Sequence, residues 1–346
     1  MLMEAQGVVQ YLNERLQLNI SMPRPGSFMK KWRNLAKRVE NLRREVNISL
    51  VGKYTKLEDS YASVTKALQH ACIAAGCKLN LTYIEAVNLE KQSKVDDPVG
   101  YHKAWQDLCK SDGVIVPGGF GQRGMEGKIE ACNWCRQTQK PMLGICLGLQ
   151  AAVIEFARNV LGLSGANTTE VDPNCEDKLV IDMPEHHPGN LGGTMRLGKR
   201  KTYLAPSIIA TLYKKDVIEE RHRHRYEVNP EYIERLEAAG LHFVGKDETK
   251  TRMEVAVVDG HPYYVTVQFH PEYLSRPLSP SPPFLGLILA STGKLKNYLS
   301  KGCRFSPRSQ SDVSSEEEDL DEDLSLGPLH ICTKNGDSVP EINGKH

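Results

Sequence analysis

Three separated stretches of this 346-residue chain carry side chains suited to nucleophilic catalysis, and the first contains Cys146. An apolar strand reaches this cysteine at the motif G-I-C-L-G-L-Q (144–150), and a helical pattern follows it. A strand-to-helix elbow holds a nucleophile exposed in a strained backbone, and the start of the helix favours a thiolate. Although a lone cysteine is more often a buried apolar residue, this context predicts that Cys146 is a nucleophile.

A base and an orienting carboxylate for this thiol lie far downstream, in the motif Q-F-H-P-E at 268–272. Pro271 biases His270 toward an extended backbone, so His270 and Glu272 can face the same side. The upstream motif P-G-G-F-G (117–121) ends another apolar strand, and such a turn can direct backbone N–H groups at an oxyanion. The predicted order is therefore nucleophile, base and orienting carboxylate.

The elements that must position these residues alternate as strands and helices. This alternation predicts an α/β fold, a doubly wound, mostly parallel sheet with flanking helices and with ligand-binding loops at the carboxyl ends of the strands. The first part has expected strands at 48–51, 79–84, 114–116 and 142–145, helices at 64–75, 101–110, 126–138 and after Cys146, and a polar loop at 86–100. Beyond it we expect strands at 179–183, 194–197, 243–244, 253–258 and 263–269, and a last helix at 285–299.

The two ends of the chain differ from this pattern. Residues 1–46 predict two amphipathic helices with a break at 23–26, and neither can bury its apolar stripe alone. The stripes contain Leu12, Leu16, Trp32 and Leu35 and are expected to lie partly exposed. From residue 303 onward the composition shifts to serine, proline and acid, with seven acids in the eight residues 316–323, which predicts a disordered tail.

Bulk properties exclude several classes of function. A net charge of +1 gives no general attraction to nucleic acid, and Arg221–Arg225 (R-H-R-H-R) is flanked by glutamates rather than by further basic residues. No apolar run approaches the roughly 18 residues of a membrane span. Nine cysteines without a signal-type start favour a reducing, cytoplasmic setting. Cys132 and Cys135 fit one face of a helix better than zinc, so no metal site is expected.

The three motifs, in this order, resemble the class I (triad) glutamine amidotransferases. Stretches at 52–55, 59–64, 118–124, 182–186, 192–198 and 220–229 narrow the resemblance to the CTP synthase family, over about residues 1–302. The resemblance implies hydrolysis of L-glutamine to glutamate and ammonia, with the ammonia used for ATP-dependent amination of UTP to CTP in pyrimidine biosynthesis.

The same resemblance implies roles for individual residues. Cys146 would attack the side-chain amide, with His270 as base and then acid and Glu272 as its partner. Glu170 and Arg225 complement the ammonium and carboxylate of glutamine. The implied glutamine-binding set is Gly119, Leu147, Gly148, Leu149, Gln150, Glu170 and Arg225, with Gly119 and Leu147 also donating to the oxyanion. Arg123 falls in a loop that resembles the family's GTP-responsive lid.

In this family a synthetase domain with a glycine-rich ATP loop precedes the amidotransferase domain, and no G-x-x-x-x-G-K-[ST] occurs here. We therefore expect an N-terminally shortened form: residues 1–46 from the synthetase end and linker, 47–302 the amidotransferase domain, and 303–346 the tail. ATP, magnesium and UTP would then belong to the missing domain, GTP would be an activator, and this chain would show glutaminase activity only. It would form a homo-oligomer or join full-length subunits; the alternative is a non-catalytic, regulatory form in such an assembly.

Overall fold

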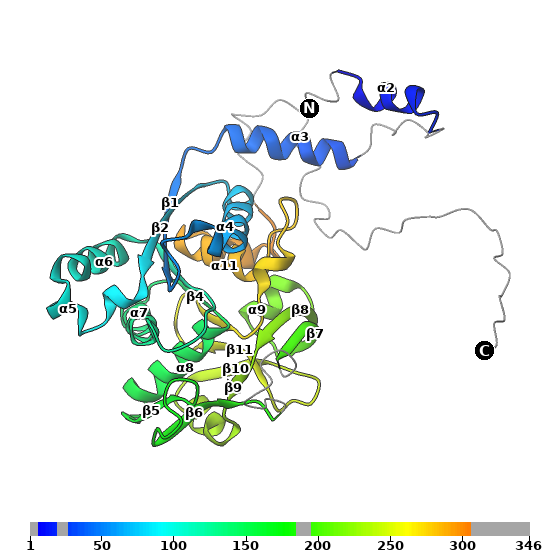
Figure 1. The fold of residues 1–346 in the computed structure, drawn as a ribbon. Helices are drawn as coiled ribbons and strands as arrows, with labels where there is room; N and C mark the ends of the chain where they lie inside the picture. The colour runs from blue at the N-terminus through cyan, green and yellow to red at the C-terminus, as the bar shows by residue number, and fades with distance from the viewer. Residues whose placement is uncertain (1–5, 19–26, 185–194, 306–346) are drawn as a thin grey trace, which may run out of the picture.

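The computed structural model describes residues 6–18, 27–184 and 195–305 (Figure 1). The acidic run and the rest of the tail beyond residue 305 lie outside the described residues. None of the helices in the described ranges is long and apolar enough to cross a membrane.

A nine-stranded sheet forms the centre of the domain, in the order β2-β1-β3-β4-β12-β11-β10-β7-β8. The first five strands in this order pair in parallel, so their carboxyl ends meet at one edge. They are β1 (Glu45–Gly52), β2 (Lys78–Glu85), β3 (Gly113–Val116), β4 (Met142–Ile145) and β12 (Tyr264–Val267). This arrangement confirms the predicted fold class.

The rest of the sheet is antiparallel and extends the domain beyond β12. It consists of β11 (Met253–Val258), β10 (Leu241–Lys246), β7 (Arg196–Leu204) and β8 (Val217–His224). A separate three-stranded sheet of β5 (Ala166–Thr168), β6 (Asp177–Asp182) and β9 (Tyr226–Val228) lies at the lower end of the domain in Figure 1.

Helices cover both faces of the parallel strands because alternate side chains of each strand point to opposite faces. Ile115, Leu143 and Val265 pack in one apolar cluster with α4 (Ala62–Ala75) and α11 (Pro282–Ser291). Val114, Met142 and Tyr264 pack in the other with three further helices. These are α6 (Pro98–Lys110), α7 (Met125–Thr138) and α8 (Leu147–Asn159).

Several predicted elements were wrong in extent. The expected loop at 86–100 contains a 3₁₀ helix, η2 (Ala86–Leu89), and a short helix, α5 (Ser93–Asp96), and α6 starts early because Asp97 caps it, accepting from the Gly100 N–H at 3.0 Å. The single last helix is two, α11 and α12 (Leu295–Ser300), because Gly293 turns the chain with a φ of +72°.

Some elements had not been predicted at all. They are strands β5, β8 and β9, helices α9 (Ile208–Tyr213) and α10 (Ile233–Ala238), and the 3₁₀ helices η1 (Glu58–Tyr61), η3 (Pro230–Tyr232) and η4 (Pro271–Leu274). Most of them are short, and the longer β8, with eight residues, gives little apolar periodicity because it is rich in charged residues.

The N-terminal helices α2 (Val8–Arg15) and α3 (Ser27–Glu40) lie beside the domain rather than within it (Figure 1). Leu16 is 61% exposed and Trp32 is 39% exposed, which agrees with the expected partial exposure of both stripes. At the other end the described chain continues past residue 302: Cys303 is buried, and the ring of Phe305 lies 4.8 Å from that of Tyr298.

Candidate active site

Cys146 occupies a tight elbow between β4 and α8. Its backbone has φ 53° and ψ −102°, a region that non-glycine residues rarely adopt, and its N–H donates to the carbonyl of Val267 at 2.7 Å. Helix α8 can approach β3 this closely because Gly148 has no side chain; a Cβ there would lie 2.1 Å from the carbonyl oxygen of Val116. The elbow therefore fixes the thiol at the carboxyl edge of the parallel strands.

His270 and Glu272 follow β12, the strand next to β4. Nδ1 of His270 lies 2.8 Å from Oε1 of Glu272, and both side chains are buried. A Cβ placed on Gly118 would lie 3.1 Å from Cε1 of His270 and 3.5 Å from Cβ of Cys146, so both side chains border this one glycine. The ring of Tyr273 stacks on the imidazole, with 5.5 Å between centroids.

The charge state of His270 depends on these neighbours. Burial by itself lowers the pKa of His270, but Cys146 and Glu272 together outweigh it and raise the pKa to about 11. The imidazole of His270 can therefore hold a proton while its neighbours are the sulfur of Cys146 and the carboxylate of Glu272. Nucleophilic catalysis by a thiol requires such a protonated base.

The two residues predicted to donate backbone N–H groups to an oxyanion, Gly119 and Leu147, lie close together. Leu147 is the first residue of α8, so its N–H is among the first four that have no acceptor within the helix. Gly119 lies beside it: a Cβ on Gly119 would be 3.5 Å from Cδ2 of Leu147. Gly119 and Leu147 therefore approach each other from the ends of β3 and β4, next to Cys146.

Glu170 and Arg225, far apart in the sequence, both contact the Pro117–Gly121 loop. Oε1 of Glu170 accepts from the Gly121 N–H at 2.8 Å. The guanidinium carbon of Arg225 lies 5.9 Å from the ring centroid of Phe120, and that of Arg223 lies 5.8 Å from it. The structure thus brings a carboxylate and guanidinium groups to the loop that borders the thiol.

The remaining residues of the predicted glutamine-binding set are packed within the protein. Gly148, Leu149 and Gln150 are buried in α8. Nε2 of Gln150 donates to the carbonyl of Tyr226 at 3.3 Å and to Oε1 of Gln268 at 3.4 Å. Gln268 in turn donates from Nε2 to Sγ of Cys146 at 3.7 Å. Sequence reasoning overlooked Gln268, although it stands inside the Q-x-H-P-E motif.

Sequence reasoning also missed two buried lysines, Lys53 and Lys128, that contact the Pro117–Gly121 loop. Nζ of Lys128 donates to the carbonyl of Pro117, and Nζ of Lys53 donates to the carbonyls of Phe120, at 3.3 Å, and Gly121. Burial lowers the pKa of Lys53 to about 8 and that of Lys128 to about 7. The sequence signal for Lys128 was a cation on the apolar face of α7, three residues after Met125 and four before Cys132.

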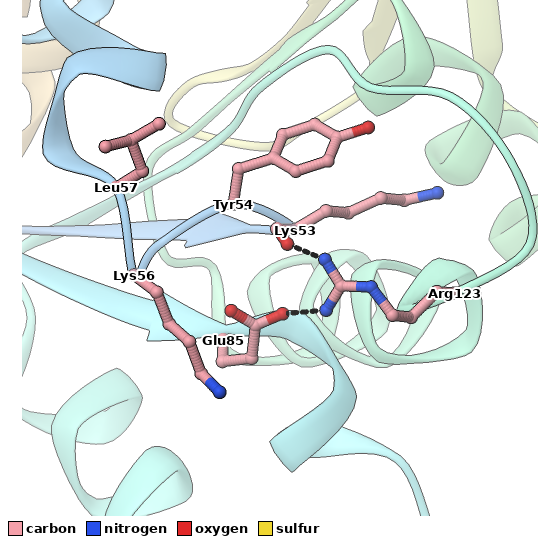
Figure 2. Close-up of a pocket in the computed structure, with 6 residues that line it drawn as sticks. All are labelled: Lys53, Tyr54, Lys56, Leu57, Glu85 and Arg123. Atoms are coloured by element: carbon pink, nitrogen blue, oxygen red, sulfur yellow. Dashed lines mark hydrogen bonds and ion pairs between the residues drawn. The ribbon is translucent and has the colours of Figure 1, made fainter.

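Arg123 lies apart from the thiol, in a cavity of about 330 Å³ (Figure 2). Its guanidinium pairs with the carboxylate of Glu85, donates to the carbonyl of Lys53 and lies 6.0 Å from the Tyr54 ring centroid. Lys56 and Leu57 complete the lining. Among the described residues, no group of three or more His, Cys, Asp or Glu side chains is arranged to hold a metal ion.

Comparison with known proteins agrees with this geometry. The family model described as "Glutamine amidotransferase class-I" matches residues 56–290, which is more than half of the chain. The chain belongs to this family. The resemblance inferred from the three motifs is thereby confirmed.

Within the class, the similarity is to CTP synthases. The CTP synthase of Drosophila melanogaster is 63% identical over 322 residues, covering 92% of this chain and 51% of the relative. CTP synthase 1 of Homo sapiens is 54% identical over 311 residues, covering 89% of this chain and 52% of the relative. The chain therefore spans about half the length of these curated relatives.

A solved structure narrows the match to one domain. The glutaminase domain of Trypanosoma brucei CTPS, solved with bound acivicin, is 36% identical to this chain, with a TM-score of 0.66. The alignment covers 72% of this chain and 94% of that domain. The parallel sheet and its elbow are thus those of the CTP synthase glutamine amidotransferase domain.

Proposed function

We propose that this chain hydrolyses L-glutamine to glutamate and ammonia, with Cys146, His270 and Glu272 as the catalytic triad. The observation that carries the proposal is the placement of His270, which borders Cys146 at Gly118 and lies 2.8 Å from Glu272. Membership of the class-I amidotransferases supports the choice of an amide substrate.

The reaction follows from the arrangement of these groups. Sγ of Cys146 attacks the side-chain amide carbon, and the amide oxygen becomes an oxyanion that the N–H groups of Gly119 and Leu147 stabilise. The His270 imidazolium donates its proton to the leaving nitrogen, so ammonia departs and a thioester remains. His270 then takes a proton from water, the resulting hydroxide attacks the thioester carbon, and glutamate leaves as the thiolate re-forms.

Binding of glutamine requires recognition of its two terminal charges. Glu170 and Arg225 offer a carboxylate and a guanidinium beside the Pro117–Gly121 loop, at Gly121 and Phe120. We assign Glu170 to the ammonium and Arg225 to the carboxylate of the substrate, because charge-assisted hydrogen bonds give both affinity and orientation.

In the complete enzyme we propose that the ammonia serves the amination of UTP to CTP. ATP, magnesium and UTP would bind a synthetase domain, in the part of the CTP synthases that this chain does not match. GTP would act as an activator at the cavity of Figure 2, where Arg123, Lys56 and the Tyr54 ring suit a purine with phosphates. The exposed Leu16 and Trp32 favour assembly with other subunits, either as an active or as a purely regulatory chain.

The decisive experiment is Cys146→Ala, with Cys109→Ala at an exposed cysteine as the matched control. Glutamate release should fall by roughly 10⁴-fold or more in Cys146→Ala because the covalent step is lost, and should not change in the control. A glutamine-mimicking electrophile should label Cys146 alone. Label on Cys132 or Cys135, or unchanged turnover in Cys146→Ala, would disprove the triad.

A second assay separates the active form from the regulatory one. The wild-type chain should release glutamate from glutamine, and should make no CTP from UTP, ATP and ammonia. A chain that releases no glutamate would support the regulatory alternative. CTP formation with ammonia, which bypasses the amidotransferase site, would reveal a synthetase site within this sequence.

A further inference from the structure

The Pro117–Gly121 loop has little in its own sequence to fix its conformation. Three of its five residues are glycines, whose backbones populate a wide range of angles. A Cβ on Gly118 would lie 3.1 Å from Cε1 of His270, so a side chain there would require the imidazole to shift. The direction of the Gly119 N–H must therefore be set by contacts from outside the loop.

Lys128 supplies such a contact at the beginning of the loop. Its side chain is fully buried, and its Nζ donates to the carbonyl of Pro117. Because the C=O and N–H of a trans peptide point in opposite directions, this bond fixes the plane of the peptide that enters Gly118.

Lys53 supplies the matching contact at the end of the loop. Its Nζ donates to the carbonyl of Phe120 at 3.3 Å, while Glu170 accepts from the N–H of the same peptide, on Gly121, at 2.8 Å. The stem of Lys53 also lies under Gly119, whose Cβ would be 3.3 Å from Cδ of the lysine. The peptide that leaves Phe120 is thus held at both of its polar atoms.

We infer that Lys53 and Lys128 are positioning residues for glutamine hydrolysis: they fix the peptide that enters Gly118 and the peptide that leaves Phe120, and so constrain the short segment between them that carries the Gly119 N–H toward the oxyanion. This inference rests on the proposed function. The lowered pKa values of both lysines do not weaken the role, because a neutral amine still donates a hydrogen bond. A lysine that only satisfied buried carbonyls would contribute to folding but not to turnover.

The test uses the full chain with Lys128→Met and Lys53→Met, and with Lys110→Met as the matched control, since Lys110 is exposed at the C-terminal end of α6. Two quantities are measured: kcat and KM for glutamine, and the rate of alkylation of Cys146 by iodoacetamide. Alkylation needs the thiolate but forms no oxyanion. We expect kcat to fall about 10²-fold in each lysine variant, as for loss of one oxyanion donor, with KM and alkylation unchanged. Lys110→Met should match the wild type.

Unchanged kcat in the lysine variants would overturn the inference. A parallel fall of kcat and alkylation would also overturn it, because the lysines would then act on the thiol or on folding. If Lys128→Met does not fold, Lys53→Met decides, since the adjoining cavity can accommodate the new side chain. Failure of the proposed function itself is distinguishable, because the wild-type chain would then release no glutamate.

Discussion

Two strongly basic stretches of this chain have similar composition and different positions in the structure. Arg221–Arg225 lies at the end of strand β8, next to the active-site loop, whereas the lysines and arginines of α3 lie on a helix beside the domain (Figure 1). The difference shows that the role of a basic stretch does not depend on its charge alone. It also depends on how the side chains alternate in the helix or strand, and on which residues pack against that element.

In β8 the two-residue period separates arginines from histidines. The exposed side carries Arg221 and Arg223, and Arg223 lies with Arg225 over the Phe120 ring. His222 and His224 point the other way and are buried, with Nδ1 of His222 3.1 Å from Nε2 of His224. Burial lowers the pKa of His222 to about 2 and that of His224 to about 3, so the contact of His222 with Glu254, at 3.7 Å, is not an ion pair.

In α3 the basic residues are partly exposed and partly half-buried. Its described contact with the domain includes a hydrogen bond from Nη1 of Arg38 to the carbonyl of Ala74 at 3.3 Å. Trp32 and Val39, from the apolar side of the helix, are exposed. A substitution at Trp32 or Val39 therefore removes less buried surface than one on the buried side of β8.

The largest effect that follows from this contrast is expected for Arg225→Gln. Loss of a charge-assisted hydrogen bond to the substrate carboxylate should raise KM for glutamine about 10- to 100-fold. The effect on kcat should be smaller because the contact is remote from the reacting amide. Steady-state kinetics measures this change in KM, with Arg221→Gln, in the adjoining strand β8, as the control. An unchanged KM would show that Arg225 does not bind the carboxylate of glutamine.

A smaller effect, on stability, is expected on the buried side of β8. His222 stays neutral in the folded chain but takes up a proton near pH 6.5 when unfolded, so protonation favours the unfolded state. Stability should therefore fall as pH drops below about 6.5, by up to about 1.4 kcal/mol per pH unit for this histidine.

The variant His222→Gln should accordingly show a flatter dependence of the free energy of unfolding on pH, between about pH 7 and pH 4. Urea unfolding at several pH values measures it, and His102→Gln, at an exposed histidine, is the control. Equal slopes in the wild type and in His222→Gln would show that His222 also binds a proton in the folded chain.

The smallest effect is expected in α3. Trp32→Ser replaces an exposed side chain, so the free energy of unfolding should change by no more than about 0.5 kcal/mol, and glutamate release should not change. Thermal unfolding and the glutaminase assay measure both quantities. A clear loss of stability would show that α3 is anchored to the domain as firmly as β8 is.

The sequence by itself determined the parallel α/β fold and the elbow at Cys146. Short apolar runs separated by helical periodicity are local signals, and each of the four strands predicted between residues 48 and 145 is present. His270 and Glu272 could be proposed because a proline and a spacing of two define their geometry locally. The separation of α11 from α12 was missed since a lone glycine does not reveal its φ angle.

Only the tertiary structure decided which distant side chains meet the active-site loop. Lys53, Lys128, Glu170 and Arg225 come from four different elements or connections and converge on the Pro117–Gly121 loop. Apart from the position of Lys128 on the apolar face of α7, no local pattern marks these residues, because a buried lysine or glutamate is stable only where another segment supplies its partner. The strand β8 was likewise not predicted from the sequence. Its residues 221–224 alternate arginine and histidine, whereas a strand is normally recognised by alternating apolar and polar residues.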